Sequence, residues 1–295
     1  MEKWMRRFLV LMAVLWTVVP QTALAAADAS VVGQSASIVS ALTLPDYTKS
    51  TVCESDLGRL TADALKAQTG SDLAIVCGGE LAAGLPKGPV TEADVLGALP
   101  GNSPVVILAV DAGLLWETLE YGLSFSVLGA DETIDRSRSE FIGFPQISGF
   151  AVEYDVSQLP GERVRYIRLA DGTRLEKDGK DTLTVAVSGF LLDPETGYTM
   201  LRHAARSDTG CGTAELLMEY IRSRESVSPD SRPRIRAVGT AENTIVNELG
   251  ILPFLPIILI VILLVSLPRG KRQLRNLDGS RSKRYRDYGD GTYDS

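Results

Sequence analysis

The pattern of apolar and polar residues predicts a series of helices and strands between two long apolar runs. Apolar residues that recur every three or four positions predict helices with one buried face, and short apolar runs that end at glycine, proline or aspartate predict strands. The predicted helices are residues 55–68, 92–99, 111–123 and 211–223, and the predicted strands are residues 37–44, 72–77, 104–110, 149–154, 163–169, 183–187 and 234–238. Because these elements follow no regular βαβ rhythm, we expect an α+β fold with a mixed sheet and packed helices.

Two of the predicted helices begin with capping signals. Ser55 is the first residue of the first predicted helix, where its hydroxyl can accept a bond from a backbone N–H of the first turn. Thr91 is followed three positions later by Asp94, a spacing that is typical of a capping box. These signals predict where both helices begin.

The first 25 residues have the layout of a secretory signal peptide. Lys3, Arg6 and Arg7 precede an apolar run over residues 8–19, and small residues follow up to Ala25. This layout predicts cleavage after Ala25 and export of the chain. An uncleaved N-terminal anchor is the alternative interpretation, although the run is short for a full membrane span.

A second apolar run, residues 249–267, contains no charged residue and is just long enough to cross a bilayer as a helix. Basic residues follow it at once, beginning with Arg269 and Lys271, and basic residues close to a span stay on the cytoplasmic side. The sequence therefore predicts one C-terminal transmembrane helix, with the domain outside the cell membrane and the C-terminus in the cytoplasm. A buried core helix is the alternative.

These signals divide the chain into a signal peptide (1–25), a connecting segment (26–51), a folded domain (52–240), a stalk (241–248), the span (249–267) and a basic tail (268–295). The whole chain has a net charge of −7; the first 25 residues carry +2 and the tail carries +4, which leaves −13 on residues 26–267. An acidic exported part repels nucleic acid, so no nucleic-acid partner is expected. The basic tail can contact anionic membrane lipid.

Five blocks of sequence, in this order, resemble the 5'-nucleotidase family in its C-terminal, substrate-recognition domain. The blocks are E-S-D-L-G from Glu54, C-G-G-E-L-A from Cys77, G-P-V-T-E-A-D-V-L from Gly88, F-P-Q-I-S-G from Phe144 and T-G-Y-T-M-L from Thr196. The resemblance covers residues 52–221 and implies the α+β fold of that domain. The N-terminal metallophosphatase domain of the family has no counterpart in this sequence.

Two-metal phosphoester hydrolysis, which the family performs in its N-terminal domain, needs several histidine and carboxylate ligands. The whole chain has one histidine, His203, and it has neither a G-N-H-E nor a G-D-x-x-D block. We therefore predict no catalytic residue and no metal ligand in this chain. Two divalent metals are expected only if the chain pairs with a separate metallophosphatase domain, which would bind them.

The resemblance also implies a ligand pocket, but with altered residues. The family loop Asn-Gly-Gly-Gly-Ile-Arg corresponds to residues 77–82, in which Ala82 stands in place of the phosphate-binding arginine and Glu80 adds a carboxylate. One of the two aromatic rings that hold the base in the family is missing near Asn102, and Phe190 corresponds to the other. The candidate ligand-binding residues are Cys77, Gly78, Gly79, Asn102, Phe190, Gly197 and Tyr198, for a nucleoside or nucleotide-like ligand.

The three cysteines, Cys53, Cys77 and Cys211, all lie in the part predicted to be exported, where disulfides are permitted. The resemblance places the segment before E-S-D-L-G and the Gly-Gly loop beside the same cleft, which implies a Cys53–Cys77 disulfide. Buried thiols are the alternative.

Two functions follow as hypotheses. The first is a membrane-anchored binding or scaffold module that is inactive alone. The second is the recognition half of a nucleotide-hydrolysing enzyme that a separate metallophosphatase completes in trans. Motifs for a serine hydrolase, a P-loop or a zinc protease do not occur in a fitting context, which argues against an independent hydrolase.

Overall fold

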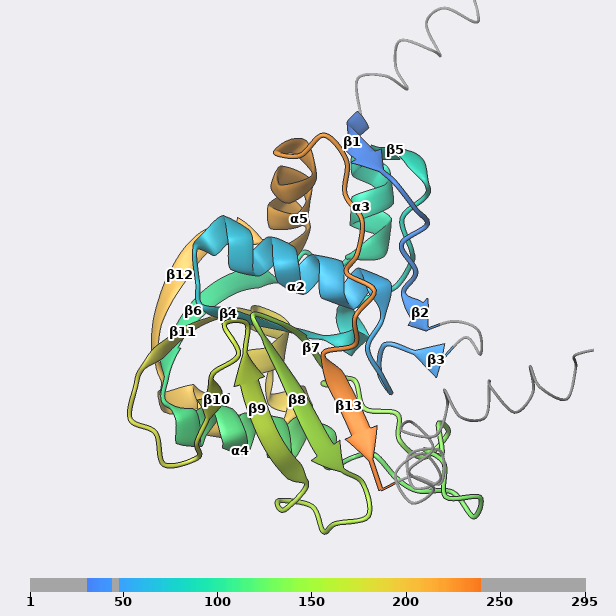
Figure 1. The fold of residues 1–295 in the computed structure, drawn as a ribbon. Coiled ribbons are helices and arrows are strands. Elements are labelled where there is room, and N and C mark those ends of the chain that lie inside the picture. The colour runs from blue at the N-terminus through green and yellow to red at the C-terminus, as the bar shows by residue number, and fades with distance from the viewer. Residues whose placement is uncertain (1–30, 44–47, 240–295) are drawn as a thin grey trace, which may run out of the picture. The chain divides into compact units, whose positions relative to one another are not determined.

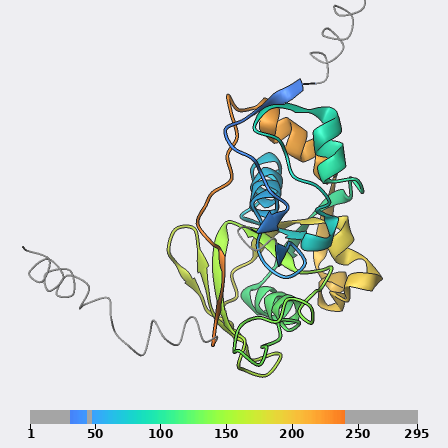
Figure 2. The same ribbon diagram turned by 90° about the vertical axis from the view of Figure 1, so that its right-hand side faces the viewer.

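A computed structural model gives the fold, and it describes residues 31–43 and 48–239 (Figures 1 and 2). The predicted signal peptide, stalk, transmembrane segment and basic tail lie outside these residues. The chain divides into two compact units, and the described residues all belong to the first, Met1–Thr244. Among the described residues, no helix is both long enough and apolar enough to cross a membrane.

A five-stranded mixed sheet forms the centre of this unit. Its strands lie in the order β12 (Ala205–Gly212), β6 (Pro104–Val110), β11 (Leu183–Ser188), β4 (Leu73–Cys77) and β7 (Pro145–Ser148). β11 and β4 are parallel, and the other neighbouring pairs are antiparallel. Every residue of β4 is buried, which fits a strand covered on both faces.

Helices cover the two faces of this sheet. Ala74 and Val76 of β4 pack in one core cluster with residues of α2 (Asp56–Thr69) and α5 (Thr213–Arg222). Leu73 and Ile75 point to the opposite face and share a core with α4 (Ala112–Leu123). Alternate residues of one buried strand therefore join two separate cores.

A second sheet packs against α4 and has the strand order β10 (Arg174–Leu175), β9 (Val164–Leu169), β8 (Phe150–Asp155) and β13 (Ile235–Val238). Its inner face contributes Phe150, Val152 and Ile167 to the core that contains α4. Its outer face is open, and Figure 1 shows no described helix in front of it. The mixed sheets and packed helices confirm the predicted α+β fold.

The N-terminal residues are part of this unit from Val31 onward. β1 (Val31–Ser35) pairs with β5 (Gly88–Thr91), and β2 (Leu42–Thr43) pairs with β3 (Thr48–Lys49). Val32 and Val39 are buried in a core that also contains α2, so the connecting segment predicted for residues 26–51 is integrated with the domain from residue 31. The strand predicted at residues 37–44 is present only in part, because Leu42–Thr43 form β2 while Val39 makes an isolated bridge to Leu85.

The last strand is held by side chains as well as by its ladder. β13 is parallel to β8 at the sheet edge. Arg234, directly before β13, donates from Nη1 and Nη2 to the two carboxylate oxygens of Asp63 on α2, at 2.8 and 2.9 Å. The backbone N–H groups of Arg234 and Ile235 donate to Glu54 Oε2 at 2.7 and 3.0 Å. The predicted strand at residues 234–238 is confirmed, and this Arg234 clamp joins it to the body of the domain.

Both capping predictions are confirmed. Ser55 Oγ accepts from the N–H of Gly58 at 3.1 Å, at the start of α2. Thr91 and Asp94 form a reciprocal capping box at the start of α3 (Glu92–Ala98). The helix predicted at residues 211–223 begins later, at Thr213, because the residues before it belong to β12. The residues of β12 before its buried end are wholly or partly exposed and mostly polar, so its sequence gives no apolar strand signal.

Candidate functional site

The loop after β4 turns sharply because two glycines allow close backbone contact. The N–H of Gly78 donates to Phe144 O, and the N–H of Gly79 donates to Ile142 O, both at 2.8 Å. A Cβ atom on Gly78 would lie 1.9 Å from Ser50 O, and one on Gly79 would lie 2.7 Å from Ile142 O. Only glycine fits at Gly78 without a shift of the backbone, so the loop forms a tight turn here.

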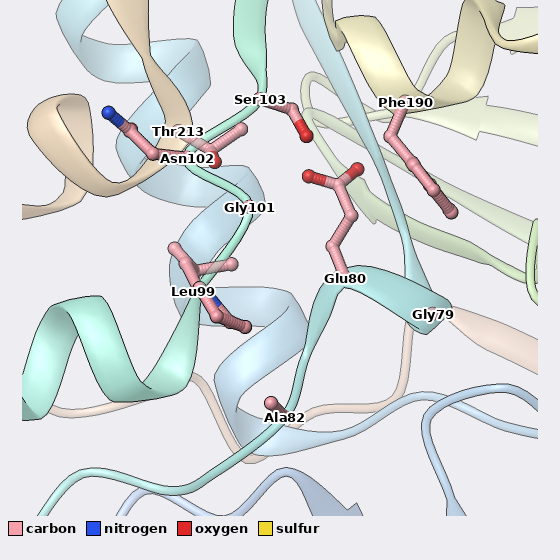
Figure 3. Close-up of a pocket in the computed structure, with 10 residues that line it drawn as sticks. Gly79, Glu80, Ala82, Leu99, Gly101, Asn102, Ser103, Phe190 and Thr213 are labelled. Carbon is pink, nitrogen blue, oxygen red and sulfur yellow. The ribbon is translucent and has the colours of Figure 1, made fainter.

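Beside this loop lies a pocket of about 160 Å³ (Figure 3). Four segments far apart in the sequence meet there: the Gly-Gly loop, the loop between α3 and β6, the 3-10 helix η2 (Gly189–Leu192) and the first residue of α5. The lining residues are Gly79, Glu80, Ala82, Leu99, Pro100, Gly101, Asn102, Ser103, Phe190 and Thr213. Glu80 is the one charged residue among these described residues, and the lining that they form contains no lysine or arginine.

Glu80 points into the space between Ser103 and Phe190 (Figure 3). Ser188 Oγ donates to Glu80 Oε1, and Ser103 also hydrogen-bonds the carboxylate. Burial raises the pKa of Glu80 to about 7, and the hydrogen bonds from the two serines oppose that rise. The carboxyl group is therefore poised to change its charge near neutral pH.

Asn102 has its amide committed to α5 rather than to the pocket. It lies in the left-handed region with a φ of 36°, its Oδ1 accepts from the N–H of Ala214 at 3.0 Å, and its Nδ2 donates to Glu215 Oε1 at 3.4 Å. Figure 3 shows the amide nitrogen directed away from Glu80. These partners occupy the start of α5, where the helix dipole would otherwise attract an anion.

Thr213 has an unsatisfied hydroxyl near the pocket, although its side chain is wholly buried. Its Oγ1 is buried and has no hydrogen-bond partner among the described residues, although its N–H donates to Ser103 O at 2.9 Å. A buried polar atom without a partner costs free energy unless a ligand or water satisfies it. The Thr213 hydroxyl is thus not exposed to the pocket, and the polar group that points into the pocket is the Glu80 carboxyl.

Phe190 is half-buried at the pocket wall and also packs on the core that contains α4. Its position is thus compatible both with a core aromatic and with a surface on which a ligand stacks. The second ring of the family pocket has no counterpart in the described lining, because Pro100 and Gly101 form the corresponding wall. A planar ligand could stack here on one side only.

Gly197 and Tyr198, predicted as ligand-binding residues, do not line this pocket. Tyr198 is buried, donates from its hydroxyl to Gly143 O at 2.7 Å and packs edge-on against Tyr121, with ring centroids 4.9 Å apart. Gly197 has a φ of 76°, and a Cβ there would lie 1.9 Å from the Tyr121 hydroxyl oxygen. Tyr198 is therefore a core residue, and Gly197 provides the turn that lies against Tyr121. Of the predicted residues, the pocket brings together Gly79, Asn102 and Phe190, while Gly78 shapes the loop.

Cys77 is also a core residue, and the structure corrects the predicted disulfide. Cys53 and Cys77, both among the described residues, are thiols. Cys77 lies with Leu73 on the α4 face of the sheet, and burial raises the pKa of its thiol well above the usual value. Gln146 pairs with Val76, so it faces the opposite side, where its Nε2 donates to the Cys53 carbonyl at 3.0 Å. The Cys53 Sγ lies 3.1 Å from Thr43 Oγ1 and is not bonded to Cys77.

No group of three or more histidine, cysteine, aspartate or glutamate side chains suited to a metal ion occurs in residues 31–43 and 48–239. His203 is exposed at the end of the 3-10 helix η4 (Thr199–His203). It lies outside the pocket lining. The described residues thus offer no cluster of this kind on which two-metal chemistry could be built.

The sequence indicates Glu80 as a carboxylate that the family loop lacks, but it does not indicate the residues that surround this carboxylate. Ser103, Ser188 and Thr213 come from three separate segments, and no motif joins them. One usable signal was that Ser188 and Ser103 stand at the ends of two apolar runs that form neighbouring strands, because such ends often carry site residues.

The fold and the pocket define an α+β domain with a small cavity between a glycine turn and the start of a helix. A profile of the family described as "5'-nucleotidase, C-terminal domain" matches residues 31–203, more than half of the chain. The chain belongs to this family.

Similar proteins are much longer than this chain. It is 31% identical over 185 residues to an apyrase of Anopheles gambiae, with 60% of this chain and 30% of that protein covered. It is 28% identical over 193 residues to the trifunctional nucleotide phosphoesterase protein YfkN of Bacillus subtilis, of which it covers 12%. The chain thus spans less than a third of these relatives.

Solved structures agree on the fold. A 5'-nucleotidase precursor from Thermus thermophilus matches with a TM-score of 0.59 and 25% identity, covering 78% of this chain and 43% of that one. A putative 5'-nucleotidase from Staphylococcus aureus matches with a TM-score of 0.60 and 19% identity, covering 70% of this chain and 41% of that one. At this identity, the match supports the fold alone.

Proposed function

We propose that this chain is a membrane-anchored recognition module outside the cytoplasm, which binds a nucleoside-like ligand and does not hydrolyse phosphoesters by itself. The nucleotide-related names of its relatives support the ligand class, and the retained Gly-Gly turn and Phe190 support a persisting pocket. The apolar run at residues 249–267, with basic residues after it, supports the anchor.

The observation that carries this proposal is the charge of the pocket. Glu80 occupies the loop, and no cationic side chain is among the described residues that line the cavity. A phosphate group placed there would face a carboxylate in a partly buried site, where repulsion is stronger than in water. An uncharged heteroaromatic ring with N–H donors fits better, since Glu80 can accept from it and Phe190 can stack on it.

A second function, completion in trans by a separate metallophosphatase, is favoured by one observation. The chain covers 30% of the Anopheles apyrase and 43% of the Thermus 5'-nucleotidase precursor, so it corresponds to only one part of each of these proteins. In this second function the chain supplies ligand recognition and the partner supplies two divalent metals.

Calorimetry of the full chain in detergent micelles tests the recognition proposal. We expect a nucleoside with an amino-bearing base to bind, and its 5'-monophosphate to bind at least about tenfold more weakly, because like charges in a partly buried site repel. Affinity should rise from about pH 6 to about pH 8, because ionised Glu80 is the stronger acceptor and its pKa is about 7. Tight nucleotide binding at neutral pH would contradict the proposed pocket chemistry.

Two variants sharpen this experiment. Phe190→Ala should weaken nucleoside binding by about 1–3 kcal/mol, the usual contribution of base stacking on an aromatic ring. Phe125→Leu, in the aromatic cluster with Phe141 away from the pocket lining, is the matched control and should leave affinity unchanged. Equal losses in both variants would place binding elsewhere.

Hydrolysis and anchoring need tests of their own. The purified chain with added Mn²⁺ should release no phosphate from nucleotides, and release above a no-protein control would overturn the inactive assignment. Extraction of cell membranes at alkaline pH should leave the chain in the membrane fraction, whereas removal of residues 249–295 should release it. Release of the intact chain would contradict the anchor.

A further inference from the structure

Four arginines gather on the open outer face of the four-stranded sheet. Glu153 on β8 and Tyr166 on β9 are cross-strand partners at its centre, and the Tyr166 hydroxyl donates to Glu153 Oε2 at 3.3 Å. The four guanidinium groups surround this pair from β9, β10 and β13. We call this set the arginine face: Arg165, Arg168, Arg174 and Arg236.

The arginine face is built in two halves. Arg165 and Arg236 lie on either side of Glu153, with Nη1 to carboxylate distances of 3.6 and 3.4 Å. Arg168 and Arg174 lie over the Tyr166 ring, at 5.1 and 5.0 Å from its centroid. One carboxylate against four guanidinium groups leaves an excess of positive charge.

These arginines are available to a partner in solution. The side chains of Arg165 and Arg236 are 55% and 56% exposed although each contacts Glu153. Arg168 and Arg174 are also exposed. Within the four strands of this sheet, the only acidic residue besides Glu153 is Asp155, at the end of β8.

The charge of this face is opposite to that of the chain around it. Residues 26–267 carry a net −13, so an anionic surface repels the domain as a whole and attracts it only where positive side chains are concentrated. Attraction at one face and repulsion at the others favour a single orientation of the domain on an anionic surface. They do not give the domain a general affinity for anions.

The position of the arginine face in the chain indicates what kind of surface it meets. Arg236 is in β13, and the uncharged run at residues 249–267 begins ten residues after Gly239. The intervening residues reach at most about 30 Å when extended. We propose that the arginine face docks the domain onto the anionic lipid surface of the membrane that holds the chain.

Arginine suits this role because its guanidinium group forms paired hydrogen bonds to phosphate oxygens. Each basic side chain near an anionic membrane strengthens binding by about fivefold. Removal of Arg168 and Arg174 together should therefore weaken docking by about 25-fold. Salt should weaken it as well, since the Debye length falls from about 8 Å at 0.15 M to about 3 Å at 1 M.

Arginine labelling of the full chain in lipid nanodiscs tests the proposal, which rests on the membrane anchor of the proposed function. Phenylglyoxal modification, followed by mass spectrometry, is compared between discs of phosphatidylcholine alone and discs that also contain phosphatidylglycerol. We expect the four arginines of the face to react at least about fivefold more slowly in the anionic discs. Arg202 and Arg206, exposed on η4 and β12, are the internal controls and should react equally in both.

A double variant separates docking from other causes of protection. Arg168→Gln with Arg174→Gln should restore the reactivity of Arg165 and Arg236 in anionic discs, whereas Arg202→Gln with Arg206→Gln should not. High salt should restore the reactivity of the unmodified chain. Equal labelling in both lipids, or protection that persists at about 1 M salt, would overturn the proposal. Failure of the chain to enter discs of either composition would instead contradict the anchor.

Discussion

The pocket and the arginine face are made in different ways, although each uses charged side chains on strands or the loops beside them. The pocket depends on backbone contacts, since Gly78 has no room for a side chain and Glu80 is held by two serines. The arginine face depends on exposed side chains that stand on a regular sheet, in four arginines around Glu153 and Tyr166. The contrast teaches that the glycine turn beneath the pocket cannot be altered without a cost in folding, whereas the charge of the arginine face can change with little effect on folding.

The largest expected effect is on the backbone beneath the pocket. Gly78→Ala should lower the free energy of unfolding by about 3 kcal/mol, because the new Cβ would lie 1.9 Å from Ser50 O and the loop would have to move. Urea denaturation of the full chain in micelles measures this loss. Gly101→Ala, also in the pocket lining but with its nearest neighbour 3.6 Å away, is the control and should change stability by less than about 0.5 kcal/mol.

The next largest expected effect is a dependence of the free energy of unfolding on pH, which Glu80 causes. Its folded pKa of about 7 is raised above the ordinary value of 4.5, so its contribution to stability is fully present below pH 4.5 and is lost as the pH rises through 7. A shift of this size corresponds to at most about 3 kcal/mol. Denaturation between about pH 4.5 and about pH 8 should show this loss in the unmodified chain.

In Glu80→Gln, the free energy of unfolding should fall less over the same pH interval, because the amide does not titrate. The difference from the unmodified chain should be at most about 3 kcal/mol. Glu225→Gln, at an exposed position on the loop after α5, is the matched control and should follow the unmodified chain. Parallel curves for all three proteins would show that the Glu80 carboxyl is not buried as described.

The smallest effect is expected on the arginine face. Arg168→Gln with Arg174→Gln should change the free energy of unfolding by less than about 1 kcal/mol, since exposed contacts of a cation with an aromatic ring contribute little. The same denaturation assay measures it. A large loss in the free energy of unfolding would mean that these arginines stabilise the sheet. The pocket and the arginine face would then not differ in how much folding depends on them.

The parts of the fold that the sequence predicted well are those with local signals. The start of α2 at Ser55 and the capping box of Thr91 and Asp94 depend on residues within one turn of each other. β12 was missed because an edge strand with mostly polar residues has no apolar alternation. The entry of β1 into the domain was missed because its pairing with β5 joins segments that are far apart in the sequence.

The candidate site was predicted only where the family resemblance supplied positions. Gly79, Asn102 and Phe190 do line the pocket, but the resemblance could not show that Asn102 bonds to the start of α5. It also could not show that Tyr198 is buried. Whether a side chain faces a cavity or a core depends on packing between distant segments, which spacing along the chain does not encode.

The Arg234 clamp gives the domain a mechanical property. Tension applied to the chain beyond Val238 acts lengthwise on β13, whose ladder with β8 is parallel, so the hydrogen bonds are loaded together in shear instead of opening one after another. The paired bonds from Arg234 to Asp63 then pass the load to α2, which packs on the central sheet. A domain fastened in this way resists being pulled open from its C-terminal end.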